Sequence, residues 1–191
     1  PVVGLIGAYI FSILTLWIVK NKAPRKVDKY FRKLQLLSAA VYSLSHGSND
    51  AQKTIGIITI VLFTNNMLGD TFYVPFWVII ISHSVIALGT LFGGWKVIKT
   101  LGMRVTKLTP FGGFSAETAA GLTIIGATLG GIPVSTTHTI TGAIIGVGSI
   151  KGFSAVRWGV AKNILWAWVL TIPLSALFAM LTYLIATGIF N

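Results

Sequence analysis

Long apolar runs separated by short basic stretches dominate the pattern of this chain. Residues 2–19 are almost unbroken apolar sequence, residues 72–94 form a second run, and residues 163–190 form a third. Each is close to or above the roughly 20 residues that a helix needs to cross the hydrocarbon core of a bilayer. The pattern therefore predicts an all-α integral membrane protein, a helix bundle in which these three segments are spanning helices.

A fourth apolar region, residues 36–64, is interrupted in its middle by the polar stretch SHGSNDAQKT at residues 45–54. Neither apolar flank is long enough to span a membrane, but the whole region is, so the polar stretch is expected near the middle of the bilayer. Ionisable residues at that depth are costly and usually functional. Asn49 and Asp50 are also preferred helix-capping residues, so we predict a discontinuous helix that restarts here.

Residues 109–149 start after one basic loop and end before another, which places both ends on the same side of the membrane. This segment holds two apolar stretches, about 116–129 and 134–147, separated by Gly-Gly-Ile-Pro. Each stretch has the length of a re-entrant segment rather than of a full span. We predict a re-entrant helical hairpin with the polar tip PVSTTH inside the membrane; two short, complete spans are the alternative.

Charge supports the membrane assignment and orients the chain. Of its 191 residues, 54% are hydrophobic and 10% charged, whereas soluble domains carry about 25% charged residues. The net charge of +11 comes from 15 Lys and Arg, which, apart from Lys53, lie in three stretches between apolar segments. Cytoplasmic loops carry such an excess, so both ends of the chain are expected on the outer side of a plasma or cell inner membrane. A clustered basic domain for nucleic acid is absent from the sequence.

The two polar motifs point to ion binding. Each is expected to aim a helix N-terminus, equivalent to roughly half a positive charge, at membrane depth, and free N–H groups there bind anions. Asn49, Ser135, Thr136 and Thr137 can donate hydrogen bonds to an oxyanion. An ionised Asp50 cannot, and its natural partner is a hard cation such as Na⁺. Because an anion beside a carboxylate is repelled unless a cation lies between them, the pattern favours binding of both, and hence symport.

Other interpretations of these residues remain open. Asp50 and Lys53 could form a structural pair on one helical turn, and the hairpin hydroxyls could serve only as caps. His46 and His138 could orient other groups or exchange protons. Ser135 and His138 could act as the nucleophile and base of an intramembrane hydrolase, but no acid is placed locally to orient the histidine, so we predict a protein that is not an enzyme.

Several more polar residues lie near the motifs without a defined role. Glu117, near the start of the hairpin, could pair with Lys53, help a cation to pass, or cap its helix. The residues that we consider as accessory to the ion site are Gln52, Lys53, Glu117, His46 and His138.

The motifs GSND at residues 47–50 and PVSTTH at residues 133–138 resemble the G-x-N-D and P-[VI]-S-T-T-H signatures of the inorganic phosphate transporter family, the sodium- or proton-coupled phosphate permeases. The resemblance implies two inverted repeats that enclose phosphate and sodium and work by alternating access, with this chain as the second repeat. It also implies roles for individual residues. Asp50, with Asn49 and Ser48 beside it, would bind sodium, and the phosphate ligands would be Asn49, Ser135, Thr136 and Thr137. The two ions are cargo, and no cofactor is expected.

Each signature occurs only once, whereas the family carries two copies. The chain begins with Pro1 rather than Met. We therefore expect it to be a single transmembrane domain, residues 1–191, that works with a first repeat supplied by the same protein or by another chain. The expected partners are phosphate, sodium, the bilayer and that first repeat. A homo-oligomer, coupling to protons instead of sodium, and transport of another tetrahedral oxyanion instead of phosphate remain open.

Overall fold

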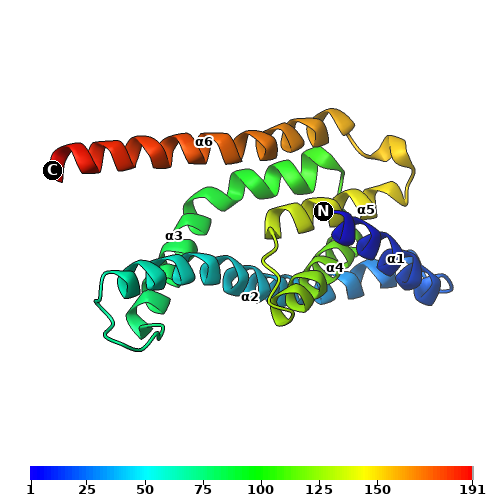
Figure 1. Ribbon diagram of the computed structural model, residues 1–191. Coiled ribbons are helices and arrows are strands. Elements are labelled where there is room, and N and C mark those ends of the chain that lie inside the picture. Colours follow the sequence, from blue (N-terminus) through cyan, green and yellow to red (C-terminus); the bar gives the residue numbers. More distant parts are fainter. Residues whose placement is uncertain (191) are drawn as a thin grey trace. The chain divides into compact units, whose positions relative to one another are not determined.

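The computed structural model describes residues 1–190, and its elements in that range are all helical (Figure 1). The helices are α1 (Val2–Val19), α2 (Pro24–Thr64), α3 (Phe76–Lys99), η1 (Thr100–Val105), α4 (Pro110–Leu129), α5 (Thr136–Ser149), η2 (Phe153–Ala155) and α6 (Trp158–Phe190). Three helical stretches are long and apolar enough to cross a membrane, namely Val2–Val19, Phe76–Val105 and Trp158–Gly188. The predicted all-α membrane fold is confirmed.

The chain divides into two compact units, Pro1–Val156 and Arg157–Asn191. The second unit is α6, which remains helical through Pro173 although proline removes a backbone donor. The hydroxyl of Thr171 donates to the Ala167 carbonyl at 2.7 Å, and Ser175 donates to the Thr171 carbonyl. Both hydroxyls are thus bonded within α6, which continues past the proline. All polar motifs lie in the first unit.

The helix break predicted at residues 45–54 is not formed, because α2 is helical at every residue from 24 to 64. Three polar side chains in this stretch bond to groups one turn away along the helix: Ser45 to the Val41 carbonyl at 2.8 Å, His46 to Asp50, and Lys53 to Asn49. Such bonds leave the backbone ladder intact, and the stretch contains no proline to interrupt it. The capping preference of Asn49 and Asp50 is therefore overridden in this helix.

Helices α1 and α5 pack with their backbones in close approach. A Cβ on Gly146 would lie within 3.2 Å of the Leu5 Cα and closer still to the Leu5 carbonyl oxygen, and one on Gly142 would meet the Pro1 carbonyl. Small residues at this spacing allow such contacts between membrane helices. The GAIIG motif at residues 142–146 therefore forms the close contact between α1 and α5, whereas an added Cβ on Gly126 of the similar GATLG motif would meet nothing within 4 Å outside its own helix backbone.

Helices α4 and α5 pack against each other as the predicted helical hairpin (Figure 1). Helix α4 ends in a Schellman motif, in which the Gly131 N–H bonds to the Thr128 carbonyl at 3.1 Å and the Ile132 N–H to the Ala127 carbonyl at 2.8 Å. Gly131 has the positive φ of 68° that this motif requires. The Gly-Gly pair thus stops α4, and the hairpin packs along α2 through α4.

Candidate functional site

Four polar side chains form one face of α2 at the middle of the helix. His46, Asn49, Asp50 and Lys53 are spaced three or four residues apart, so they lie on the same side. His46 Nε2 is 3.0 Å from Asp50 Oδ2, and the His46 ring stacks on Tyr42 with centroids 5.9 Å apart. Lys53 Nζ donates to Asn49 Oδ1 at 2.9 Å and to Asp50 Oδ1 at 3.1 Å. The carboxylate thus has a donor at each oxygen.

The tip of the hairpin brings the second motif onto this face. Thr136 Oγ1 donates to Asp50 Oδ2 at 2.9 Å, and Lys53 Nζ donates to the Val134 carbonyl at 2.7 Å. Thr136 is only 2% exposed, so its hydroxyl is fixed against the carboxylate. Two motifs more than 80 residues apart in the sequence therefore meet at Asp50, which is the contact that the ion-site hypothesis requires.

Asn49 joins the same face to the end of α4. It is 3% exposed, and its Nδ2 donates to Thr128 Oγ1 at 2.9 Å. Its amide oxygen accepts from Lys53 at the same time, so both ends of the amide are used. Buried amides in such networks fix the relative positions of the elements that they join. Asn49 therefore fixes the position of the hairpin tip relative to α2.

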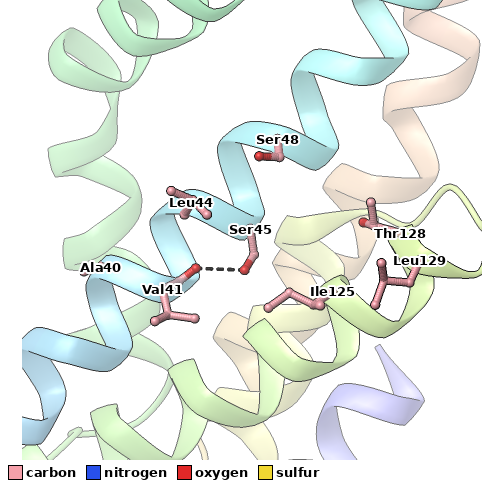
Figure 2. A pocket seen from close by; sticks show the side chains of 8 residues that line it. All are labelled: Ala40, Val41, Leu44, Ser45, Ser48, Ile125, Thr128 and Leu129. Carbon is pink, nitrogen blue, oxygen red and sulfur yellow. Dashed lines mark hydrogen bonds between the residues drawn. The ribbon is translucent and has the colours of Figure 1, made fainter.

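A cavity of about 380 Å³ lies beside this network, between α2 and α4 (Figure 2). Thr128 is in its wall, whereas Asp50 is not, so the cavity adjoins the polar face rather than containing it. Ser45 in the wall is bonded to its own helix, which leaves the lining mostly apolar. The residues that line it are Ala40, Val41, Leu44, Ser45, Ser48, Ile125, Thr128 and Leu129.

The N-terminus of α5 carries the remaining hydroxyls. Ser135 is the N-cap, and its Oγ accepts from the His138 N–H at 3.3 Å. The first N–H groups of a helix have no acceptor within the helix, so this end offers donors to an anion. Ser135 and Thr137 are exposed here, whereas Thr136 between them is buried. The three hydroxyls of the motif thus have different surroundings.

The structure brings together five of the predicted site residues and separates others from them. Asn49, Asp50, Lys53, His46 and Thr136 form the bonded network. Ser135, Thr137 and His138 lie next to it at the start of α5. Ser48 instead lines the cavity, and Gln52 is exposed. Val134 and Thr128 were not predicted, because a main-chain carbonyl and a lone threonine at a helix end give no sequence signal.

Two of the three roles considered for Glu117, pairing with Lys53 and capping its helix, are wrong, whereas a role in the passage of a cation stays a prediction. Its Oε2 accepts from Ser38 Oγ at 2.6 Å, and 15 residues of α2, about 22 Å of helix, separate Ser38 from Lys53. A Glu117–Lys53 pair is therefore out of reach. Glu117 does not cap its helix either, because the N-cap of α4 is Thr109, which accepts from the Gly112 N–H. The contact with Ser38 instead fastens α4 to α2.

Replacing Ser38 by Ala is expected to destabilise the α2–α4 packing. Ser38 is 7% exposed, and its loss leaves the Glu117 carboxylate without this donor. A hydrogen bond to a charged group of this kind contributes about 1.5 to 3 kcal/mol. Thermal unfolding of the detergent-solubilised protein measures the change. Ser43→Ala, at an exposed position on the same helix, is the matched control and is expected to leave the midpoint unchanged; equal midpoints for the two variants would contradict a fastening role.

Residues 5–179 match the model of the phosphate transporter family. The chain belongs to this family. Among its relatives, it is 54% identical over 97% of its length to a probable low-affinity inorganic phosphate transporter of Rhizobium meliloti, and 40% identical over its full length to one of Bacillus subtilis. It covers 56% and 57% of those two proteins, so it spans little more than half of their length.

A solved structure supports the same assignment of fold. The present chain is similar in structure to a protein described as "The sodium-dependent phosphate transporter", with a TM-score of 0.68 and 32% sequence identity. The match covers 84% of this chain and 41% of that one. The family and these relatives are transporters, which confirms the prediction that the chain is not an enzyme. Ser135 and His138, the pair considered for a hydrolase, lie in one turn of α5, where the Ser135 hydroxyl oxygen accepts from the main-chain N–H of His138 as an N-cap.

Proposed function

We propose that this chain is one half of a carrier that moves inorganic phosphate across a membrane together with a cation, by alternating access. The observation that supports this most directly is the hydrogen bond from Thr136 to Asp50. It sets an anion-attracting helix start beside a carboxylate, in a helix of a membrane protein. Helix N-termini near the bilayer midplane bind anionic substrate groups in many secondary transporters. Here α5 supplies a helix N-terminus, whereas α2 is continuous.

Phosphate is proposed to bind at the start of α5. Ser135 and Thr137 are exposed there, and because the Ser135 oxygen accepts from the helix backbone, its O–H remains able to donate outward. Thr136 and Asn49, the other proposed phosphate ligands, are buried and engaged with Asp50 and Thr128. We infer that the exposed groups contact phosphate first and that the buried pair joins only when the tip moves.

The coupling cation is proposed to bind at Asp50, with sodium as the leading candidate. A cation between phosphate and this carboxylate removes the repulsion between the two negative groups. Asn49 supplies an amide oxygen next to Asp50, whereas Ser48 lines the cavity and would join the site only after a rearrangement. This set of oxygen ligands is the type that hard cations prefer.

Proton coupling is the second candidate, and one contact favours it. His46 Nε2 lies 3.0 Å from Asp50 Oδ2, so the two groups can share a proton that either could release to the opposite side. The stacking on Tyr42 orients the imidazole toward the carboxylate. The two candidates use the same carboxylate and differ only in the ion that neutralises it.

The other half of the carrier is proposed to be a first repeat, in the same protein or in another chain, that closes the site opposite the hairpin tip. Both ends of the present chain are proposed to lie on the outer side of the cell membrane, since the basic stretches of the sequence are then cytoplasmic. Rocking of the repeats, or movement of the hairpin tip, would expose the site to each side in turn.

Uptake of labelled phosphate into proteoliposomes tests this function. The intact transporter is expected to give saturable uptake that a sodium gradient accelerates, with a proton gradient as the parallel arm for the second candidate. Uptake that neither gradient affects would contradict coupling. Uptake that does not saturate would indicate a channel instead of a carrier.

A further inference from the structure

The ammonium group of Lys53 occupies a position that a metal cation would suit. Its Nζ contacts three oxygens of different kinds, the Asp50 carboxylate at 3.1 Å, the Asn49 amide at 2.9 Å and the Val134 main-chain carbonyl at 2.7 Å. Carboxylate, amide and main-chain oxygens together are a typical ligand set for hard cations. A cation that approaches Asp50 in this state therefore meets a site already filled by the protein's own positive charge.

A purely structural ion pair does not account for this lysine. The side chains of Lys53 and Asp50 are 40% and 32% exposed, and a pair with that exposure adds little stability. The sequence predicts that residues 36–64 of α2 cross the membrane, where a lysine is costly and usually functional. Its four-carbon stem is flexible, so the ammonium can leave these oxygens without any movement of α2.

The position of Lys53 also links the two proposed binding sites. Val134, whose carbonyl it contacts, directly precedes Ser135, the N-cap of α5. The ammonium thus lies between the Asp50 carboxylate and the helix start at which phosphate is proposed to bind. A phosphate there carries one or two negative charges and attracts Lys53 away from Asp50, which vacates the oxygens for a cation.

We propose that Lys53 is a competitor of the coupling cation for the oxygens at Asp50. Its ammonium group occupies these oxygens until bound phosphate attracts it away. This inference rests on the proposed phosphate and cation sites. It gives the carrier a defined order, in which phosphate binds first and the cation second. It also makes the two affinities interdependent, because each ligand favours the state in which Lys53 has left Asp50.

The test compares Lys53→Met with the wild type in the intact, purified transporter. Equilibrium binding of labelled sodium is measured with and without inorganic phosphate, together with the half-saturation of uptake for both ions. In the variant, sodium binding without phosphate is expected to tighten by up to about fivefold, the upper end of what a partly exposed ion pair provides. Phosphate binding is expected to weaken, and the effect of phosphate on sodium affinity is expected to shrink.

Two further variants separate charge from structure. Lys53→Arg keeps the positive charge and is expected to leave sodium binding as weak as in the wild type. Lys29→Met removes an exposed lysine from the same helix and is expected to change neither affinity. A general loss of structure would weaken both ions together, whereas competition moves their affinities in opposite directions.

The outcomes also separate this inference from the proposed function. A wild type that takes up no phosphate overturns the function itself. A wild type that transports with a cation gradient, combined with an unchanged or weaker sodium affinity in Lys53→Met, overturns only the competitor role. Tighter sodium binding together with weaker phosphate binding supports both.

Discussion

Asp50→Asn is expected to abolish cation-dependent phosphate uptake while the protein remains folded. Asparagine has nearly the same shape and retains one oxygen acceptor, but it lacks the charge that holds Lys53 and would bind the coupling ion. The contacts of α2 with the hairpin through Asn49 and Ser38 are left in place. Uptake of labelled phosphate in proteoliposomes, with and without a sodium gradient, measures the effect.

The matched control is Asp28→Asn on the same helix. Asp28 pairs with Arg32 at 3.1 Å, but the two side chains are 47% and 71% exposed. Removing that charge is therefore expected to leave uptake within about twofold of the wild type. Undiminished gradient dependence in Asp50→Asn, with the control equally active, would remove Asp50 from the coupling mechanism.

Gly146→Val is expected to have the largest effect on folding. The new side chain would meet the backbone of Leu5, and backbone cannot move aside as a flexible side chain can. Helices α1 and α5 must then separate, and overpacking of this kind costs about 1 to 3 kcal/mol, with the upper end expected because backbone atoms are in the way. The thermal unfolding midpoint of the detergent-solubilised protein is expected to fall, and the fraction of monodisperse protein with it.

Gly126→Val provides the comparison for this change, because it makes the same substitution in the second GxxxG motif. Its added Cβ has no other atom within 4 Å, so no change in the midpoint is expected. Because the change in helix propensity is the same in both variants, a difference between them isolates the close packing. Equal losses of stability would show that contact with α1 is not what makes residue 146 sensitive to this substitution.

The interruption predicted in α2, which the structure does not contain, shows where sequence reasoning failed. Polar residues with high capping preference in the middle of a membrane helix predict a break, since an unsatisfied polar group is costly there. In the folded chain the same residues find partners one turn away and across the hairpin, as Asp50 does with His46 and Thr136. The partner from the hairpin lies 86 residues away, so no local window could have supplied it.

Glu117 gives the same lesson for a single residue. By charge alone, Lys53 is the expected partner of Glu117. In the structure Glu117 accepts from Ser38, and Lys53 lies too far along α2 from Ser38 to reach it. The charges in a sequence indicate which residues could pair, but the distances in the folded chain decide which pairs form.

The sequence by itself determined the features that depend on local composition. Apolar length predicted membrane helices, the Gly-Gly-Ile-Pro turn predicted the hairpin, and two motifs predicted the family, because each of these is set by neighbouring residues or by the residues' own identity. Only the tertiary structure decided that Thr136 meets Asp50, that Lys53 fills the oxygen set beside it, and that α2 remains unbroken. These features depend on distances between segments far apart in the chain, which are fixed only when α2, α4 and α5 pack together.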